Sequence, residues 1–542
     1  MTLTLVRILI TSILLGLAFL FVWIFIKIWV ICNFHLFPRA KRRLEDFFKI
    51  DPYAEKKDEL RIENMMDRKV AIIPTKEVKS FLEQTPEEEI FIGVKQEGKK
   101  KIPVKVPLAA LSRHTHIMGS TGSGKTKLCV LPIAIQLLRR DCGLVCITFK
   151  EDRELGHVLK KEAEAMGKKF YYLSLNPRDA SHEYNPLYNG SPGNFVERLM
   201  VALDLEMPGA AKFYTHAQRA ALTPVFSYFA KNRIIPNLRD LHDILISEKH
   251  LAKILKEETG REVSQREMEH LMGAGYALSR LVHDDIARRI MSYNPDIRFE
   301  EILNEKSVLY CNLKTDINPA LAVSVGKMLL LDMQYHCGDR SEDSKLFGVF
   351  IDEFQDAACQ AFLDLLTKLR VSNLGFFLAN QNLSQLKEVS KEFAQTVHTN
   401  TATKVVFRLR DAQDAKLFAE DSGTTEYMDT GMTQKGIGKD GLEYLDGERD
   451  VAGRITNKAK TYLHANRFLA LPDGEGIIFP PSGLAEVVRF GFVVDREEDG
   501  DLTKTYMDED SLVVIQHDTE EDGYEVYGVD FYRNLLRKAI DD

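Results

Sequence analysis

The chain has 542 residues, of which 45% are hydrophobic and 28% charged, so its composition excludes a disordered or fibrous protein and its length favours two or three domains. The formal net charge is −8 but unevenly spread: residues 495–542 hold 16 acidic and 5 basic residues, which is −11 and leaves +3 for residues 1–494. This acidic C-terminal tail is either an interaction tail or a solvated end. The seven cysteines lie in apolar segments without metal-ligand spacing, which indicates reduced thiols in a cytosol-facing protein.

The first segment, residues 1–37, predicts a membrane anchor. Residues 5–37 are apolar apart from Arg7, Lys27 and a few small polar groups, and a helix needs only ~20 such residues to cross ~30 Å of hydrocarbon. A cleavable signal peptide is the alternative, but its apolar region would be shorter and would end at a small-residue cleavage site, which is not seen. A basic cluster at residues 39–43 follows, and the positive-inside rule puts it in the cytoplasm. We therefore expect a single-pass anchor with the bulk of the chain in the cytoplasm.

The next part of the chain predicts an α/β domain. Residues 38–110 are charged and mixed, which indicates a membrane-proximal linker and the start of this domain. From residue 111 onward, apolar strands alternate with helical patterns, as in a parallel sheet wrapped by helices. The expected strands are 114–118, 143–149, 169–173, 307–313, 346–352, 374–379 and 403–409.

One long interruption divides this domain. Residues 192–300 show helical spacing and almost no strand signal, so we expect an all-α domain inserted between residues 111–191 and residues 301–494 of the α/β domain. Residues 423–465 are rich in Gly, Asp, Thr and Lys without periodicity, which predicts an exposed excursion.

A phosphate-binding loop follows the first expected strand of the domain. The pattern G-x-x-x-x-G-K-[ST] is matched by Gly119, Ser120, Thr121, Gly122, Ser123, Gly124, Lys125 and Thr126. Glycines let successive backbone N–H groups point at phosphate oxygens, and the N-terminus of the following helix favours negative charge. Lys125 would lie between the β- and γ-phosphates and Thr126 would bind Mg²⁺, so ATP and Mg²⁺ are the expected cofactors. An interior proline costs a helix about 3 kcal/mol, so Pro132 requires a local structural reason.

Hydrolysis needs a second strand, and the segment LFGVFIDEFQD (346–356) supplies it. Asp352 would hold the magnesium ion through its water shell, and Glu353 would polarise the attacking water. Gln381 ends the next expected strand, where it would sense the γ-phosphate or position water. Arg408 and Arg410 share one face near a strand end, so either is a candidate arginine finger for a neighbouring subunit's nucleotide; ordinary surface arginines are the alternative.

Several segments in this order resemble type IV secretion coupling proteins (TraD/TraG-like, of the HerA/FtsK-type P-loop superfamily). They are RHTHIMGSTGSGKT, GSGKTKLCVLP with its proline, ITFKEDRELG, SHEYNPL, FIDEFQDA, ANQNLSQL and LPDGEGIIF. The resemblance covers roughly residues 110–490 and the anchor before them. The phosphate loop alone is shared by many NTPases, whereas the ordered set is far more specific.

This resemblance implies a RecA-like ATPase, hexameric and anchored in the inner (cytoplasmic) membrane. Such proteins recruit relaxase-bound single-stranded DNA, relaxosome proteins or effector proteins and pass them to the type IV secretion channel. By position, Lys125 and Thr126 would bind ATP and Mg²⁺, Asp352 and Glu353 would serve hydrolysis, and Gln381 matches the family's sensor. The helical insertion would help to recognise cargo, with most of residues 213–222 in its core.

The chain departs from the family pattern in two places. Many members have two membrane spans, whereas one is found here, which leaves the contact with the channel open. The second-strand motif D-P-K-G-E is replaced by Phe149-Lys150-Glu151-Asp152. Two other functions therefore stay open: an FtsK/HerA-like DNA pump, and a nucleotide-gated docking receptor for secreted protein effectors, which the acidic tail would suit.

Overall fold

The computed structural model describes residues 20–24, 72–206, 212–432, 453–494 and 505–512. The chain forms two compact units, Met1–Asp67 and Arg68–Asp542. In the first unit, residues 20–24 are helical with exposed apolar side chains, and the rest of the predicted anchor lies outside the described residues. Within the described ranges, no helix is both long enough and apolar enough to span a membrane.

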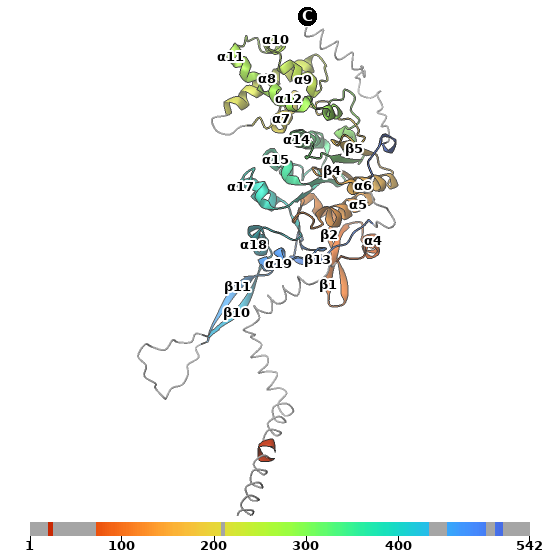
Figure 1. Cartoon of the computed structure of the whole chain (residues 1–542), viewed down its shortest axis with the longest axis vertical. Coiled ribbons are helices and arrows are strands. Elements are labelled where there is room, and N and C mark those ends of the chain that lie inside the picture. The colour runs from red at the N-terminus through yellow and green to blue at the C-terminus, as the bar shows by residue number, and fades with distance from the viewer. Residues whose placement is uncertain (1–19, 25–71, 207–211, 433–452, 495–504, 513–542) are drawn as a thin grey trace, which may run out of the picture. The chain divides into compact units, whose positions relative to one another are not determined.

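A large mixed sheet forms the centre of the second unit (Figure 1). Its strand order is β2-β1-β13-β12-β9-β3-β8-β7-β4-β6-β5. Neighbouring strands from β9 to β5 are parallel, and the remaining pairs are antiparallel. The bounds are β1 Glu89–Glu97, β2 Lys100–Pro107, β3 Thr115–Met118, β4 Gly143–Thr148, β5 Phe170–Ser174, β6 Val308–Asn312, β7 Phe347–Asp352, β8 Leu374–Asn380, β9 Thr403–Val406, β12 Glu475–Phe479 and β13 Glu486–Arg489.

The parallel strands are buried on both faces, and successive side chains belong to two different cores. In β4, for example, Leu144 and Cys146 pack in one core while Val145 and Ile147 pack in the other, as the alternation of a strand requires. The first core is completed by helices α5 (Leu131–Arg139) and α6 (Arg153–Ala165). On the opposite face lie helices of the second core, among them α14 Pro319–His336, α15 Ala361–Lys368, α17 Lys391–Asn400 and α18 Ala412–Asp421.

Between β5 and β6 the chain is helical, and the helices α8 to α12 gather away from the sheet (Figure 1). The segment is joined to α14 by a fully buried ion pair, in which Arg198 lies 2.9 Å from Asp332 while the Tyr184 hydroxyl donates to the same carboxylate at 2.7 Å. Removing one partner would leave a buried charge unpaired, so this pair makes the packing of the helices on α14 specific. The helices are α7 Pro192–Ala202, α8 Lys212–Lys231, α9 Leu238–Leu245, α10 Glu248–Thr259, α11 Gln265–Leu271, α12 Gly273–Val282 and α13 Phe299–Asn304.

The structure corrects the expectation that most of residues 213–222 lie in the core. Phe213 and Tyr214 are exposed, and their rings form edge-on contacts with the ring of His270 on α11. Only the later positions of the segment, such as Ala221 and Leu222, are buried. The helical spacing was present, but the first turn of α8 extends beyond the neighbouring helices.

Two other segments also differ from expectation. Residues 423–465 were predicted as an exposed excursion, without any strand. In the structure β10 (Thr424–Met432) and β11 (Gly453–Thr461) form a separate antiparallel pair, and residues 433–452 lie outside the described chain. Neither strand has an apolar alternation in its sequence, and the pair joins no larger sheet among the described strands. Part of the acidic tail, residues 505–512, is ordered beside α6, where Met507 is buried.

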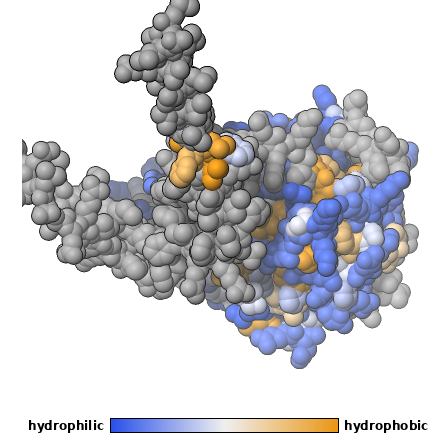
Figure 2. Space-filling view, turned by 90° about the horizontal axis from the view of Figure 1, so that it is seen from below, coloured by the Kyte–Doolittle hydropathy of each residue, from blue (hydrophilic) through white to orange (hydrophobic). Residues whose placement is uncertain are grey.

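The outside of the described body is mostly hydrophilic on the face drawn in Figure 2, with single apolar side chains between the polar ones. This pattern is typical of a folded soluble surface. The cysteines in the described part of the chain are free thiols, and all of them except Cys359 are buried.

Candidate nucleotide site

The phosphate loop follows β3 and is held by its two neighbouring strands. The Gly119 N–H donates to the Asn380 carbonyl oxygen at 3.4 Å, and the Ser120 N–H donates to the Arg408 carbonyl oxygen at 2.8 Å. Gly124 has φ = 97°, a left-handed conformation that favours glycine. A Cβ at Gly119 would approach the Ser123 Oγ to 2.6 Å. The loop therefore needs its glycines for both conformation and space.

The interior of the loop is built to receive an anion. The hydroxyls of Ser120 and Ser123 are buried without a hydrogen-bond partner among the described residues, which is costly unless a ligand supplies one. The Lys125 ammonium is also buried; burial lowers its pKa despite the nearby charges of Glu353 and Asp352, and its Nζ donates to the Gly119 carbonyl oxygen at 2.8 Å. Phosphate oxygens match this donor set, so the residues fit a nucleoside triphosphate.

The helix after the loop explains Pro132. Residues Lys125–Val130 form a π-helical turn, η3, in which the Leu131 N–H donates to the Thr126 carbonyl oxygen, and α5 begins only at Leu131. Pro132 therefore occupies the first turn of the α-helix, where a missing N–H costs little. The wider π turn, which is frequent at functional sites, separates the loop lysine from the regular helix.

A magnesium site is indicated where the loop meets β7. The Thr126 hydroxyl donates to Asp352 Oδ2 at 2.6 Å, and the Glu353 N–H donates to Asp352 Oδ1 at 3.0 Å. Burial raises the pKa of Asp352, although the hydrogen bond from Thr126 opposes this shift. A hydroxyl and a buried carboxylate are oxygen ligands of the kind that Mg²⁺ prefers, so the pair fits this ion.

Glu353 lies at the same edge of the sheet in a left-handed conformation, with φ = 54° and ψ = 51°. Such a backbone is unfavourable for a glutamate and is a sign of a functional constraint. Its Oε2 accepts hydrogen bonds from Gln355 Nε2 at 2.8 Å and from Gln381 Nε2 at 3.2 Å. Gln381 Oε1 in turn accepts from the Thr121 hydroxyl at 3.0 Å, so the Gln381 amide connects the phosphate loop to Glu353.

The strand order explains this arrangement. β8 lies between β3 and β7, so the phosphate loop, Gln381 and the Asp352–Glu353 pair follow the carboxyl ends of three adjacent parallel strands. In open α/β sheets, ligands bind outside the carboxyl ends of the strands. Gln355 was missed from the sequence, because an amide in a short turn (η7, Phe354–Asp356) carries no signal of its direction.

The structure does not bring Arg408 and Arg410 to the acidic pair. β9 ends at Val406, so both arginines lie beyond the strand rather than on it. The Arg408 guanidinium lies 2.9 Å from the Asp473 carboxylate, and the Arg410 residue is exposed. The finger role expected of either arginine concerns a neighbouring subunit's nucleotide, so the geometry of one subunit leaves it a prediction.

The second-strand segment forms its own polar cluster after β4. Glu151 accepts hydrogen bonds from Arg153 Nη2 and Asn176 Nδ2, each at 2.8 Å, and from Lys314 Nζ at 3.1 Å. Burial opposes the charge of Glu151, but the bonds from Arg153 and Lys314 outweigh it and lower its pKa. Lys150 is exposed. The cluster joins the carboxyl ends of β4, β5 and β6.

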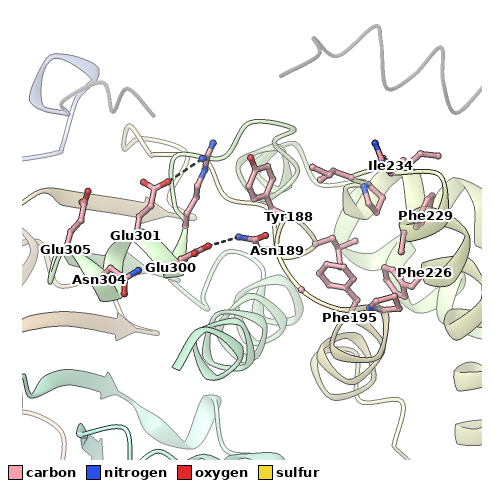
Figure 3. A pocket seen from close by; sticks show the side chains of 18 of the residues that line it. Tyr188, Asn189, Phe195, Phe226, Phe229, Ile234, Glu300, Glu301, Asn304 and Glu305 are labelled. Atoms are coloured by element: carbon pink, nitrogen blue, oxygen red, sulfur yellow. Dashed lines mark hydrogen bonds and ion pairs between the residues drawn. The ribbon is translucent and has the colours of Figure 1, made fainter. Parts of the chain in front are cut away.

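A separate cavity of about 600 Å³ is lined by residues of the helical segment and of α13 (Figure 3). Its floor is formed by Phe195, Phe226 and Phe229 of the helical segment, while Glu300 and Glu305 lie on the opposite wall. Other wall residues precede β5 and β6, at the amino edge of the sheet, whereas the phosphate loop lies at the carboxyl edge. The cavity is therefore not part of the nucleotide site.

The fold and the loop together define a class: a RecA-like P-loop domain with a large mixed sheet. Residues 347–465 match the family model described as the TraM recognition site of TraD and TraG. A search of the curated proteins found no match.

Solved structures of the plasmid coupling protein TrwB share this fold. The unbound TrwBΔN70 form superposes with a TM-score of 0.58 at 16% identity, covering 79% of this chain and 94% of TrwB. TrwB with the ATP analogue ADPNP gives 0.58 at 17% identity, covering 78% and 93%, and TrwB with ADP and Mg²⁺ gives 0.57 at 18%, covering 78% and 94%. The family model and the fold confirm the resemblance to type IV secretion coupling proteins.

Proposed function

We propose that this chain is the coupling ATPase of a type IV secretion system. In this proposal it is anchored in the inner membrane by residues 1–37 and acts as a homo-hexamer. It would recruit relaxosome proteins with single-stranded DNA, or protein substrates, and deliver them to the channel. The observation that carries the ATPase part is the 2.6 Å hydrogen bond between Thr126 and Asp352 beside the buried Lys125, because it joins the phosphate loop to the acidic strand end.

ATP and Mg²⁺ are the proposed cofactors, supported by the nucleotide-bound structures of TrwB with the same fold. The loop N–H groups, the free hydroxyls of Ser120 and Ser123 and the Lys125 ammonium would hold the phosphates. Thr126 and Asp352 would hold Mg²⁺, which when bound neutralises charge on the β- and γ-phosphates. Glu353 would orient and polarise the attacking water. Gln381, which is hydrogen-bonded to both Thr121 and Glu353, would make the position of Glu353 depend on the phosphate loop.

The proposed partners follow from the family model. Residues 347–465 match the TraM recognition site of TraD and TraG, and we propose that this part of the chain contacts a relaxosome protein. The region begins with β7 and includes α18 and β10 as well as the acidic pair. A partner bound there would therefore contact the same chain segment that supplies Asp352 and Glu353.

Two variants test the ATPase. Lys125→Ala removes the loop cation and is expected to lower ATP hydrolysis roughly 100-fold or more, with loss of substrate transfer and an unchanged melting temperature. Glu353→Gln is expected to bind ATP with near wild-type affinity but not to hydrolyse it, as measured by equilibrium binding and phosphate release. Lys249→Ala, an exposed lysine on α10 in the helical segment, is the matched control.

Transfer assays with the same variants separate the alternatives. Loss of transfer with Glu353→Gln supports a motor. Full transfer with that variant would instead mean that hydrolysis is not needed, and would overturn the motor in favour of a nucleotide-gated docking receptor.

A further inference from the structure

We propose that Gln355 is a positioning residue that fixes the carboxylate of Glu353 for activation of water. The proposal rests on the ATPase function above. It assigns a role to a residue that follows the acidic pair but has no place in the phosphate-loop motif.

The geometry singles out one oxygen of Glu353. Its Oε2 accepts from two primary amides, Gln355 Nε2 at 2.8 Å and Gln381 Nε2 at 3.2 Å. Hydrogen bonds to a charged acceptor are roughly twice as strong as neutral ones. With Oε2 bound from two directions, the carboxylate is fixed in rotation, and Oε1 is the oxygen left for the attacking water.

The side-chain amides of Gln355 and Gln381 differ in their other contacts. Gln381 is shared with the Thr121 hydroxyl of the phosphate loop, so its position depends on the loop and its ligand. Gln355 lies in η7, two residues after Glu353, and its turn is closed by the Asp356 N–H donating to the Glu353 carbonyl oxygen at 3.0 Å. Gln355 therefore moves with Glu353 and keeps its contact when Gln381 is engaged by the loop.

The Gln355 amide is held in this orientation at some cost. Its own Oε1 is buried without a hydrogen-bond partner among the described residues, and such an oxygen destabilises a fold. A rotated amide would direct the oxygen lone pairs at the carboxylate, so the amide nitrogen must face Glu353. The left-handed backbone of Glu353 is a second unfavourable feature in the same turn. Two costs at one turn indicate selection for the position of the carboxylate rather than for stability.

The charges around Glu353 explain why a second amide is needed. Asp356, in the same turn, is half-buried, and burial together with the charge of Glu353 raises the pKa of Asp356 to about 6. Lys125 and Asp352 are the other charged groups coupled to this site. Near neutral pH the Asp356 carboxylate repels Glu353, and the donors of Gln355 and Gln381 oppose that repulsion.

Steady-state ATPase assays of the full-length chain test the proposal with Gln355→Met, which keeps the length of the side chain and removes the donor. We expect kcat to fall about tenfold, with KM for ATP within about twofold of the wild type. A general loss of structure would also weaken nucleotide binding, whereas a misplaced carboxylate should leave the Kd for ATP, measured by equilibrium binding, unchanged. Gln360→Met, an exposed glutamine at the start of α15, is the matched control and should behave as the wild type.

A second variant tests the same role of Gln355 if Gln355→Met does not fold. Gln355→Asn keeps the amide but shortens the side chain, so it should show the same loss of kcat with the same unchanged Kd for ATP. A wild-type kcat for either folded variant, or a loss of ATP affinity equal to the loss of kcat, while Glu353→Gln is inactive, would overturn the role of Gln355 alone. Turnover by Glu353→Gln, or none by the wild type, would overturn the proposed ATPase function instead.

Discussion

Thr126 and Asp352 form the shortest link between the phosphate loop and the acidic strand end, and each needs the other. Asp352 is nine-tenths buried, and burial disfavours its charge. The 2.6 Å hydrogen bond from Thr126 offsets part of that cost. In the nucleotide-bound protein, the same two oxygens are the ones that we expect to hold Mg²⁺.

Thr126→Val, which replaces the hydroxyl by a methyl group of similar size, should therefore impair the metal site selectively. We expect roughly tenfold more Mg²⁺ to be required for half-maximal ATPase activity, consistent with the loss of one oxygen ligand, with nucleotide binding in EDTA almost unchanged. Thr126→Ser keeps the oxygen and should resemble the wild type. An unchanged Mg²⁺ requirement for the valine variant would remove Thr126 from the metal site.

The raised pKa of Asp356 can be tested through the pH dependence of protein stability. Its pKa is raised from 3.8 to about 6 by burial and by Glu353, so the native state binds the proton more tightly than the unfolded state. The stability contributed by this group is therefore lost as the pH rises from about 4 to above 6. Asp356→Asn should raise the free energy of unfolding at pH 8 by on the order of 1 kcal/mol, after discounting for solvent screening. The gain should shrink at pH 5, as measured by denaturant unfolding at both values; an equal gain at both would contradict the assignment.

Among the helices and strands, α5 packs on the sheet through apolar side chains and is also hydrogen-bonded to β1 by the buried Gln136. Gln136 Oε1 accepts from the Phe91 N–H at 2.8 Å, and Gln136 Nε2 donates to the Phe91 carbonyl oxygen at 2.9 Å. Phe91 lies at a β-bulge, where the register of β1 against β2 shifts. The glutamine thus supplies the hydrogen bonds that a neighbouring strand would otherwise make.

Gln136→Leu should leave two buried backbone groups of Phe91 without partners. We expect a loss of roughly 2–5 kcal/mol in the free energy of unfolding, measured by denaturant titration. Gln84→Leu, at the exposed C-terminus of α4 (Thr75–Glu83), is the control and should change stability by less than about 0.5 kcal/mol. A small effect at Gln136 would mean that β1 finds other partners.

Some helices and strands could be predicted from the sequence more accurately than others. The parallel strands were predicted within a residue or so, except that β9 ends three residues early, because strands buried on both faces are continuous apolar runs. The antiparallel β1 and β2 lie in residues 38–110, for which no strand bounds were predicted, and β2 is largely exposed. The contact of Gln381 with Glu353 follows from adjacent strand ends. The contacts of Gln355 and of Arg408 with Asp473 depend on side-chain directions in turns, which no periodicity encodes.

For the whole molecule, the division into Met1–Asp67 and Arg68–Asp542 leads to a test of the proposed anchor. Deleting residues 1–67 should move the protein from the membrane fraction to the soluble fraction, because it removes the apolar segment. The remaining unit contains every residue of the nucleotide site, so its affinity for ATP should stay within about twofold of the full chain, within the scatter expected for independent sites. Membrane flotation and nucleotide titration measure the two outcomes, and a truncated protein that still floats with membranes would contradict the anchor.

The ordered stretch 505–512 has a mechanical consequence. The Arg153 guanidinium carbon lies over the Tyr506 ring, 3.5 Å from the ring centroid. The Ala180 N–H donates to the Met507 carbonyl oxygen at 2.8 Å. Arg153 is itself bonded to Glu151 after β4. A displacement of residues 505–512 would therefore be transmitted through Arg153 to the residues that follow β4, the strand that borders β7.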